Sequence, residues 1–229
     1  MNKGVLYPVG TPIGNLKDIT LRALEILKEV DLIASEDTRH TRKLLSHYDI
    51  HTSLTSFYEH NQLKKTPYLI DCLKKGKNVA LVSKAGMPGI SDPGYYLIKE
   101  AVKEKIKIVP IPGPTALAIA LVASGLPMDN FVFEGFLGRR KSERMKKLKK
   151  LREEERTIII YEAPHRLKKT LEEIREVLGD RRIAVGRELT KKFEEIIRGR
   201  VSEVEDIFKE RTPRGEFTLV IEGKAPHLS

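Results

Sequence analysis

The chain has 229 residues, 40% of them hydrophobic, and this length favours two compact domains. No apolar run approaches the roughly 18 residues that span a bilayer, and the single cysteine, Cys72, excludes a disulfide scaffold and a zinc site of paired thiolates. With a start that lacks a secretory pattern, these features predict a cytoplasmic protein rather than a membrane or secreted one, and the formal net charge of +10 favours a polyanionic partner.

Short runs rich in valine and isoleucine alternate with helical patterns, which is typical of an α/β fold with strands buried on both faces. In the first half, strands are expected at residues 4–10, 31–35, 52–56, 78–83 and 107–111. Helices are expected at residues 18–30, 39–46 and 62–75, and after Pro93. Three prolines at positions 110, 112 and 114 then interrupt regular structure, so we divide the chain into domains at 1–111 and 112–229.

The second half begins with a helix of small residues, expected at 115–123. Further helices are expected at residues 139–152, 165–178 and 201–210. Strands are expected at residues 130–136, 157–163, 181–189, 193–199 and 216–223. Because some of the late strands follow one another without an intervening helix, we expect a mixed sheet in this half.

Three clusters of glycine and proline directly follow predicted strands: VGTPIGN (9–15), SKAGMPGISDPG (83–94) and PIPGPTA (110–116). In a parallel sheet, ligands bind outside the carboxyl ends of the strands, where glycine lets the backbone approach a ligand. A single cluster would indicate a tight turn, whereas three at one edge predict a binding cleft. The chain has neither a GxGxxG fingerprint nor a phosphate loop, which argues against a dehydrogenase or a P-loop NTPase.

Clusters that pair carboxylates with basic residues follow other strands: SEDTRHT (35–41), FYEHN (57–61), YEAPHR (161–166) and GRELTKKFEE (186–195). Such pairs suit proton transfer or the binding of a ribose and a phosphate. The first cluster also has the pattern of a helix start, with Ser35 or Asp37 as the N-cap. The histidines lack the spacing of a zinc helix, so we expect no metal site.

The excess of positive charge is concentrated in RRKSERMKKLKKLR (139–152), which has nine basic residues and one acidic residue. This composition favours binding of RNA. The alternative is a solvated helix with an apolar stripe of Met145, Leu148 and Leu151, followed by the counter-charges of Glu153, Glu154 and Glu155. We favour RNA because a solvated helix usually mixes its signs of charge along its length.

Seven motifs in order resemble the tetrapyrrole methylase superfamily and, within it, the RsmI-type ribosomal RNA small-subunit methyltransferases: VGTPIGNLKDIT, DLIASEDTRHT, LVSKAGMPGISDPG, PIPGPTA, YEAPHR, RELTK and GEFTLVIEG. The resemblance covers about residues 4–223. It implies two α/β domains of the tetrapyrrole methylase type (class III S-adenosylmethionine-dependent methyltransferases), an active site in the cleft between them, and a homodimer. The implied reaction is 2′-O-methylation of a cytidine in the decoding centre of the 16S rRNA of the small ribosomal subunit.

The resemblance also implies which residues contact S-adenosylmethionine, largely through the backbone. These are Pro12, Ser83, Gly86, Met87, Ile90, Gly113, Thr115, Ala116, Tyr161, Leu189 and Thr218. The family usually reads SDAGTP where this chain reads SKAGMP, so Lys84 and Met87 depart from the pattern. We expect this departure to weaken donor contacts by side chains and to preserve those by the backbone. Longer relatives continue into a helical extension, so we expect RNA docking to rest on the two domains.

Methylation of a hydroxyl needs a group that removes its proton. The candidates are Glu36, Asp37, His60, Glu162 and Glu188, of which we prefer Glu36 or Asp37. RNA contacts are expected from Arg39, Arg139, Arg140, Lys146, Lys149, His165, Arg166 and Arg187. The arginines of the strand-end clusters could instead pair with Glu162 and Glu188 across the domain interface. Two other functions stay open: a small-molecule methyltransferase acting on a tetrapyrrole, and a non-catalytic RNA-binding factor that retains the donor cleft.

Overall fold

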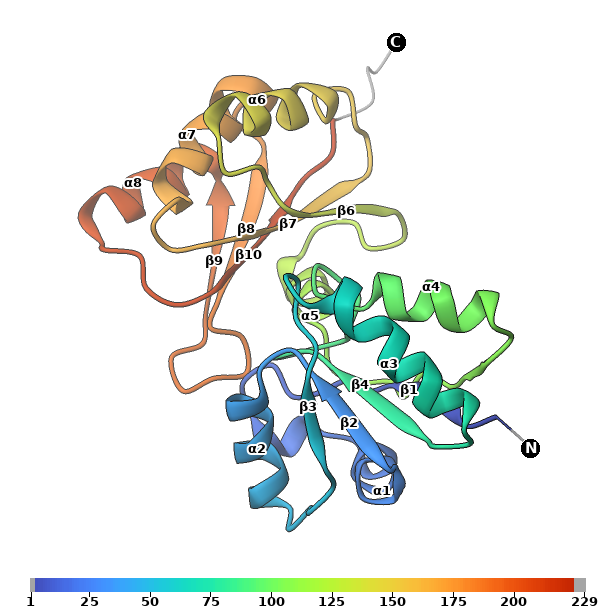
Figure 1. Cartoon of the computed structure of the whole chain (residues 1–229). Coiled ribbons are helices and arrows are strands. Elements are labelled where there is room, and N and C mark those ends of the chain that lie inside the picture. Colours follow the sequence, from blue (N-terminus) through green and yellow to red (C-terminus); the bar gives the residue numbers. More distant parts are fainter. Residues whose placement is uncertain (1–2, 225–229) are drawn as a thin grey trace. The chain divides into compact units, whose positions relative to one another are not determined.

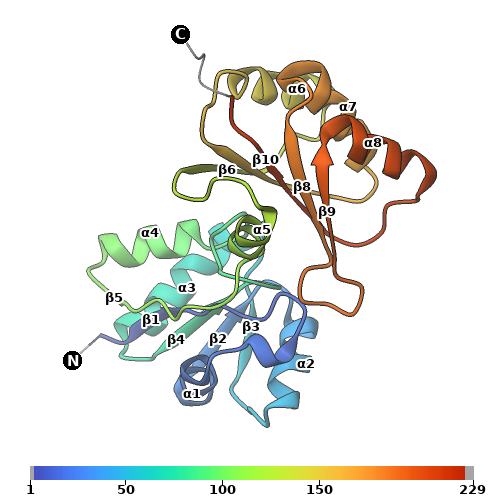
Figure 2. The ribbon, with the colours of Figure 1, turned by 180° about the vertical axis from the view of Figure 1, so that it is seen from behind.

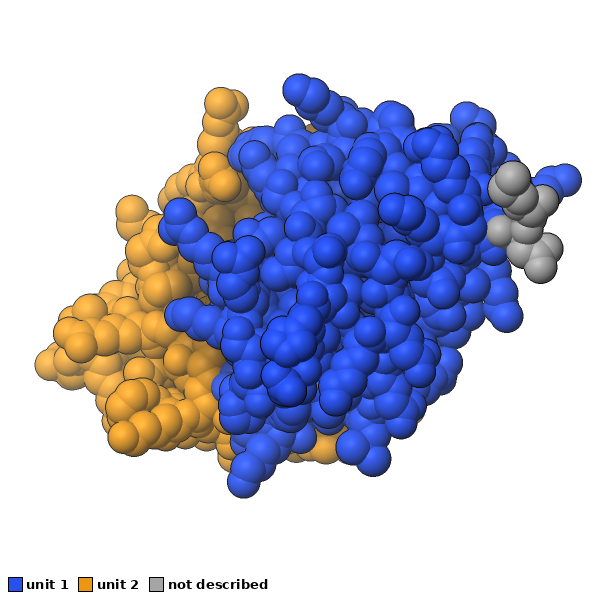
Figure 3. All heavy atoms as spheres, turned by 60° about the horizontal axis from the view of Figure 1, so that its bottom comes forward, with its two compact units in different colours: residues 1–115 blue, residues 116–229 orange. Residues whose placement is uncertain are grey.

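The computed structural model describes residues 3–224 (Figure 1). The chain divides into two compact units, residues 1–115 and 116–229, so the division falls slightly beyond the position expected from the prolines (Figure 3). Each unit is built around one five-stranded sheet, which confirms the α/β class. Within the described range, no helix is both long enough and apolar enough to cross a membrane.

The sheet of the first unit is parallel throughout, with the strand order β3-β2-β4-β1-β5. Its strands are β1 (Val5–Pro8), β2 (Leu32–Ser35), β3 (Leu54–Ser56), β4 (Val79–Val82) and β5 (Lys107–Ile108). The central strand β4 is buried at every position, as expected for a strand covered on both faces. Because all five strands run in one direction, their carboxyl ends share one edge of the sheet.

Four helices cover this sheet: α1 (Leu21–Glu29), α2 (Thr38–His47), α3 (Gln62–Lys74) and α4 (Tyr95–Lys103). Helices α1 and α2 contribute Leu27 and Leu45 to the apolar core on one face. Helices α3 and α4 lie on the other face (Figure 2). They contribute Leu73 and Leu97 to the core there. The unit is therefore a three-layered sandwich whose connecting loops lie at the edges of the sheet.

The start of α1 differs from the expected position. Residues Leu16–Asp18 form a 3₁₀ turn, η1, and the helix begins only at Leu21. The hydroxyl of Thr20 accepts a hydrogen bond of 3.1 Å from the backbone N–H of Ala23, so Thr20 is the N-cap. The expected start at Asp18 therefore falls within the 3₁₀ turn.

The second unit has a mixed sheet with the order β6-β7-β10-β8-β9. Its strands are β6 (Phe131–Phe136), β7 (Thr157–Glu162), β8 (Arg182–Arg187), β9 (Glu195–Arg200) and β10 (Phe217–Ile221). Only β6 and β7 pair in parallel, and β7, β10, β8 and β9 pair in antiparallel succession. The expectation of a mixed sheet is confirmed.

One face of this sheet is covered by α6 (Lys141–Lys150), α7 (Leu167–Leu178) and α8 (Val201–Glu210). Side chains that alternate along the strands, such as Ile158 and Ile160, form the core beneath these helices. Helix α5 (Ala116–Ser124) packs on β7, β8 and β10. The alternate residues of these strands, including Tyr161 and Thr218, point away from the three helices.

Candidate functional site

The three loops rich in glycine and proline follow β1, β4 and β5, which are neighbours in the order β4-β1-β5. Residues Thr11 and Gly86 exchange backbone hydrogen bonds of 2.9 and 3.0 Å, which join the first loop to the second. The backbone N–H of Gly10 donates to the carbonyl oxygen of Ile111 at 3.0 Å and joins the first loop to the third. The loops expected to form a binding surface therefore meet at one place.

Gly10 and Gly113 allow this convergence because they lack side chains. A Cβ atom on Gly10 would lie 2.6 Å from the Cα of Gly113 and 2.7 Å from the sulfur of Met87. A Cβ on Gly113 would lie 2.7 Å from the Cα of Gly10. Real Cβ atoms do not approach backbone so closely, so both positions require glycine. The sequence placed Gly10 in the first cluster, VGTPIGN, but not among the expected donor contacts.

The loop after β4 is shaped by its own hydrogen bonds. Gly86 has a φ of +82°, a left-handed conformation that glycine adopts without strain. The buried hydroxyl of Ser83 donates to the carbonyl oxygens of Ala85 and Gly86 at 3.2 and 3.3 Å. The side chain of Ser83 is thus used within the loop, and the neighbouring surface is made mostly of backbone and of apolar side chains such as Met87 and Ile90.

Glu36 follows β2 directly and is connected to the same loop. Its carboxylate accepts a hydrogen bond of 2.8 Å from the backbone N–H of Lys84. Its own backbone N–H donates to the carbonyl oxygen of Val82 at 3.2 Å. The half-buried carboxylate of Glu36 is therefore held beside the loop that contains Gly86.

Asp37 is the N-cap of α2, as one interpretation of SEDTRHT predicted. Its carboxylate accepts hydrogen bonds of 3.0 Å from the backbone N–H groups of Arg39 and His40. The bond from His40 is the main cause that lowers the pKa of Asp37, and the positive charge of Lys84 contributes. Asp37 is consequently a weak base, because a carboxylate with a low pKa accepts a proton poorly.

His60 lies in the turn between β3 and α3 and is exposed. Its ring contacts the ring of Tyr58 edge to face, with centroids 6.4 Å apart. Since β3 is the neighbour of β2, His60 and Glu36 both follow strands at the same edge of the sheet. The structure thus brings Glu36, Asp37 and His60 to the edge that carries the glycine loops.

In the second unit, three of the expected donor contacts are close together. Thr218 on β10 is paired with Tyr161 on β7 and with Gly186 on β8. The side chain of Leu189 covers Gly186, where an added Cβ would lie 3.1 Å from it. The hydroxyl oxygen of Tyr161 accepts a hydrogen bond of 3.2 Å from the backbone N–H of Leu117, at the start of α5. Tyr161, Thr218 and Leu189 therefore form one patch beside α5.

Glu162 is buried and holds two elements of the second unit together. Its side chain is 0% exposed. The carboxylate accepts hydrogen bonds of 2.7 Å from Arg166, 2.6 Å from the hydroxyl of Thr170 and 2.7 Å from the backbone N–H of Ala163. These contacts attach the start of α7 to the end of β7, so neither Glu162 nor Arg166 offers a free charged group, whereas His165 between them is exposed.

Glu188 and Arg187 are also engaged within the second unit. Burial opposes ionisation of Glu188, but hydrogen bonds from Lys191 and from the backbone N–H of Glu216 outweigh it and lower its pKa. Lys191 donates to Glu188 at 2.8 Å and to Glu216 at 2.7 Å. Arg187 donates to the carbonyl oxygen of Arg214 at 2.7 Å. All these partners lie within the second unit.

Helix α6 and the two residues before it present the predicted basic residues to solvent. Arg139, Arg140, Lys146 and Lys149 are all exposed. The inward side was only partly predicted: Leu148 and Leu151 are buried, but Met145 is half-buried and Arg144 takes the inward position. The guanidinium of Arg144 forms two hydrogen bonds of 2.7 Å to the carboxylate of Glu173 on α7. The sequence pattern missed this residue because it counts arginine as a surface residue.

The acidic run after α6 does not neutralise the helix. Glu154 forms an ion pair of 2.8 Å with Arg156, which lowers the pKa of Glu154 to about 2. Glu153 contacts Lys224 and lies 4.0 Å from Arg152. The exposed lysines Lys146 and Lys149 have no such partner among residues 3–224.

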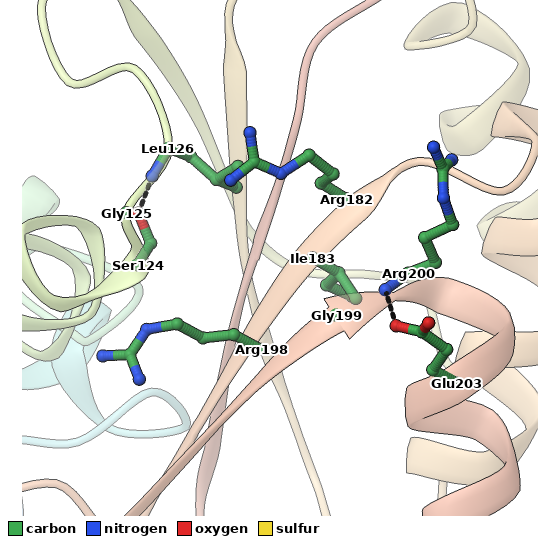
Figure 4. Close-up of a pocket in the computed structure, with 9 residues that line it drawn as sticks. All are labelled: Ser124, Gly125, Leu126, Arg182, Ile183, Arg198, Gly199, Arg200 and Glu203. Carbon is green, nitrogen blue, oxygen red and sulfur yellow. Dashed lines mark hydrogen bonds between the residues drawn. The ribbon is translucent and has the colours of Figure 1, made fainter.

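A cavity of about 470 Å³ in the second unit contains three arginines that the sequence had not indicated (Figure 4). Arg182 and Arg200 stand opposite each other on β8 and β9. Arg198 donates to the carbonyl oxygen of Ala123 at the end of α5, at 2.9 Å. Carboxylates accompany these charges: Glu203 lines the cavity, and Glu222 lies 3.9 Å from Arg182. The cavity is therefore of mixed charge.

No group of three or more histidine, cysteine, aspartate or glutamate side chains in the described range is arranged to hold a metal ion.

Comparisons with known proteins agree with this architecture. A family profile described as Tetrapyrrole (Corrin/Porphyrin) Methylases matches residues 5–205. A protein of Halalkalibacterium halodurans named ribosomal RNA small subunit methyltransferase I is 52% identical over 97% of this chain and 77% of its own length. A protein of the same name from Thermotoga maritima is 51% identical over 96% of this chain and 99% of its own.

A solved structure of the methyltransferase CobJ superposes with a TM-score of 0.72. The superposition covers 98% of this chain and 95% of the CobJ chain, and the two sequences are 19% identical. At this level of identity the similarity concerns the fold, which is the two-sheet α/β architecture implied by the motifs.

Proposed function

Because this chain belongs to the tetrapyrrole methylase family and, within it, to the ribosomal RNA small subunit methyltransferases I, we propose that it methylates 16S rRNA of the small ribosomal subunit. The proposed reaction uses S-adenosylmethionine and adds a methyl group to the 2′-oxygen of a cytidine in the decoding centre. The observation that carries the proposal is the identity of 51–52% to relatives of that name over almost the whole chain. The convergence of the three glycine loops supports it.

The residues at these loops fit the methyl donor. Gly10 and Gly113 leave no room for a side chain between their backbones, while a Cβ on Gly86 would meet only ordinary contacts, 3.5 Å from Ile13 and 3.6 Å from the carbonyl oxygen of Pro114. Backbone groups and apolar side chains dominate this surface, which suits a nucleoside and an amino-acid chain whose ammonium and carboxylate groups can form hydrogen bonds with the backbone. We propose donor contacts from Pro12, Ser83, Gly86, Met87, Ile90, Gly113, Thr115 and Ala116, and from Tyr161, Leu189 and Thr218 of the second unit.

When bound, S-adenosylmethionine supplies a methyl group on a positively charged sulfur. The protein has to orient a ribose hydroxyl towards this group and exclude water, and orientation of this kind can contribute roughly 7–11 kcal/mol. Glycine loops held by reciprocal hydrogen bonds, such as those between Thr11 and Gly86, provide a rigid surface for this task. Positioning therefore accounts for a larger share of the proposed catalysis than charged side chains do.

We propose Glu36 as the group that orients the ribose hydroxyl or accepts its proton. The other carboxylates are already engaged. Glu162 accepts three hydrogen bonds, and Glu188 forms an ion pair with Lys191. Asp37 caps α2, and its pKa is lowered. Glu36 lies at the edge with the glycine loops and is held by one backbone N–H, that of Lys84. His60 is the second choice, since it is exposed and follows the neighbouring strand.

The basic residues of α6 favour RNA over a tetrapyrrole as the substrate. Lys146 and Lys149 are exposed on α6, and Arg139 and Arg140 are exposed directly before it. Of the glutamates that follow, Glu153 pairs with Lys224 and Glu154 with Arg156. A small pigment does not need such a surface, whereas RNA gains affinity from each phosphate that is neutralised. We propose these four residues, together with Arg39 and His165, as RNA contacts. Arg166 and Arg187 are weaker proposals because their guanidinium groups bind Glu162 and the carbonyl of Arg214.

Two experiments test the function. Calorimetry with S-adenosylmethionine measures whether the purified protein binds the donor. Incubation of unmodified small ribosomal subunits with the protein and labelled donor, followed by nucleoside mapping, should locate the methyl group on the 2′-oxygen of one cytidine. Donor binding without methylation would favour the non-catalytic RNA-binding factor, and methylation of a tetrapyrrole instead of RNA would favour the small-molecule enzyme. We further propose that the protein is cytoplasmic and forms a homodimer, and light scattering of the purified protein tests the dimer.

A further inference from the structure

The outer face of helix α2 carries only positive charge. Between Thr38 and His47 the helix contains no acidic residue. Its buried side consists of Thr41, Leu44 and Leu45. The exposed side forms a shallow hollow of about 520 Å³, and its lining residues are Arg39, Arg42, Lys43, Ser46 and His47. We call this set of five residues the α2 basic face.

The cations of the α2 basic face lack compensation by neighbours. Among residues 3–224, neither Arg42 nor Lys43 forms an ion pair or a hydrogen bond through its side chain. Arg39 lies in the first turn of the helix, where the macrodipole disfavours a positive charge by about 0.3–1 kcal/mol. An exposed helix normally carries both signs of charge. A face with cations only is less stable because its like charges repel one another, and such a face therefore indicates an anionic partner.

The position of α2 relates this face to the candidate site. Asp37, the N-cap of α2, is close enough to Lys84 for the positive charge to lower its pKa. Glu36, one residue earlier, binds the backbone of Lys84 in the donor loop. The α2 basic face therefore starts beside Glu36, within the same unit. It extends away from that point by about 12 Å, the rise of eight helical residues from position 39 to position 47.

We propose that the α2 basic face binds the phosphate backbone of the substrate RNA, on the strand that leads to the methylated nucleotide. The proposal rests on the proposed function and adds to it a second RNA surface, in which Arg42, Lys43 and His47 join Arg39. The charge pattern selects RNA: the face has cations at several successive positions and no apolar anchor, which suits a linear polyanion. A protein partner would normally bury aromatic or aliphatic side chains.

The test is the salt dependence of RNA binding. In the variant Arg42→Gln/Lys43→Gln, glutamine keeps the helix because its helix propensity is close to that of arginine and lysine. If each cation neutralises one phosphate, the slope of log affinity against log salt for a single-stranded RNA oligonucleotide should become less negative by about 1.4, and affinity at physiological salt should fall about tenfold. Calorimetry should show an unchanged affinity for S-adenosylmethionine.

Matched variants separate position from net charge. Lys64→Gln/Lys77→Gln removes two exposed cations from the same unit and should leave the slope at the parental value. Arg42→Lys/Lys43→Arg keeps the charges and should also preserve the slope. The proposal is overturned if the α2 variant and the Lys64/Lys77 variant have the same salt slope. It is also overturned if the α2 variant binds free RNA with parental affinity and loses affinity only for the assembled small subunit. That second result would assign the face to a ribosomal protein.

The two proposals fail in different ways. If the parent protein binds RNA with the α2-dependent slope but does not methylate small subunits, the α2 surface is supported and the proposed reaction is wrong. If the parent methylates small subunits and the α2 variant does so at the parental rate and slope, the reaction stands and the α2 surface is wrong.

Discussion

The carboxylate of Glu36 accepts a hydrogen bond of 2.8 Å from the backbone N–H of Lys84. This contact joins the end of β2 to the loop after β4, in which Ser83 and Gly86 shape the proposed donor surface. Because the N–H group that donates this hydrogen bond belongs to the backbone, a lysine at position 84 can form the contact as well as the aspartate that is usual in the family. The positive charge of the Lys84 side chain instead acts on Asp37, whose pKa it helps to lower.

The first prediction separates the two roles of Glu36. Glu36→Gln keeps an oxygen that accepts the hydrogen bond from Lys84 but cannot take a proton, so the rate of methylation of small subunits should fall by about 10²–10⁴ while donor affinity is unchanged. Glu36→Ala removes the acceptor as well and should also weaken donor binding. A parental rate for Glu36→Gln in single-turnover assays would exclude Glu36 as the base and direct attention to His60.

The second prediction concerns the contact between Gly10 and Gly113. In Gly113→Ala, the new Cβ would stand 2.7 Å from the Cα and 2.8 Å from the carbonyl carbon of Gly10, so the loops must separate. We expect at least a tenfold loss of donor affinity by calorimetry, with a circular dichroism spectrum like that of the parent.

The control for this prediction is Gly179→Ala at the end of α7. Gly179 has a φ of +86° and no neighbour within 4 Å of an added Cβ. Its ψ is −175°, and an L-residue in this glycine-favouring region costs roughly 1–3 kcal/mol of stability. The control should therefore unfold at lower temperature and still bind the donor normally. Equal donor affinity for parent and Gly113→Ala would contradict the assignment of the loops.

The third prediction tests the cap of α2 and its dependence on pH. Asp37→Ala removes the acceptor for the backbone N–H groups of Arg39 and His40, and should lower the free energy of unfolding by about 1 kcal/mol at neutral pH. The pKa of Asp37 is lowered in the folded protein, so the ionised carboxylate stabilises the fold above the ordinary pKa of 3.8. This contribution is lost as the pH falls through the folded pKa.

The difference in stability between parent and Asp37→Ala should therefore shrink in denaturant titrations as the pH is lowered below 3.8. Asp37→Asn serves as the control, because asparagine caps a helix about as well and does not titrate. It should retain most of the stability at neutral pH and methylate small subunits. Loss of methylation in a stable Asp37→Asn protein would show that Asp37 takes part in the reaction.

The order of strands and helices was predictable because it depends on local patterns. Buried parallel strands such as β4 appear as continuous apolar runs, and amphipathic helices such as α7 show a period near 3.6 residues. Differences arose where a short-range contact decides a boundary. The 3₁₀ turn at Leu16–Asp18 delays the start of α1, and β3 is limited to Leu54–Ser56.

The candidate site was predictable only in part. Glycine and proline after strands indicated the three loops, since topology brings the ends of parallel strands together. The partners of charged residues were not predictable from residue type, whether they lie nearby in the chain, as for Glu162, or in a distant segment, as for Arg144. Glu162 is enclosed by the start of α7, and the buried pair of Arg144 and Glu173 joins residues 29 positions apart. Burial, rather than residue type, decides which charged side chains remain available.

The fourth prediction concerns this buried pair. The side chains of Arg144 and Glu173 are each 6% exposed, and Arg144 also donates to the carbonyl oxygen of Arg139 at 2.8 Å. Arg144→Met leaves Glu173 buried without a partner, and should lower the free energy of unfolding by about 3–5 kcal/mol. The double variant Arg144→Met/Glu173→Leu removes both charges and should recover most of that loss. A double variant as unstable as the single one would show that packing, not charge, explains the effect.

The last prediction concerns the exposed basic residues of α6 and of the two positions before it. If Arg139, Arg140, Lys146 and Lys149 neutralise about four phosphates, they contribute roughly −3 to the salt slope for single-stranded RNA. Changing all four to glutamine should flatten the slope by that amount and leave donor binding intact. The fold should persist because Leu148, Leu151 and Arg144 keep the inner side of the helix.

A variant with Lys64, Lys77, Lys99 and Lys105 changed to glutamine removes the same net charge from the first unit and is the control. Because these lysines lie outside both proposed RNA surfaces, this control should retain the parental slope, apart from a small loss of long-range attraction that salt screens. If the α6 variant keeps the parental slope and methylation rate, α6 is a solvated helix. RNA docking would then rest on the α2 basic face and on His165, and combining the α6 and α2 variants would produce no greater loss of affinity than the α2 variant alone.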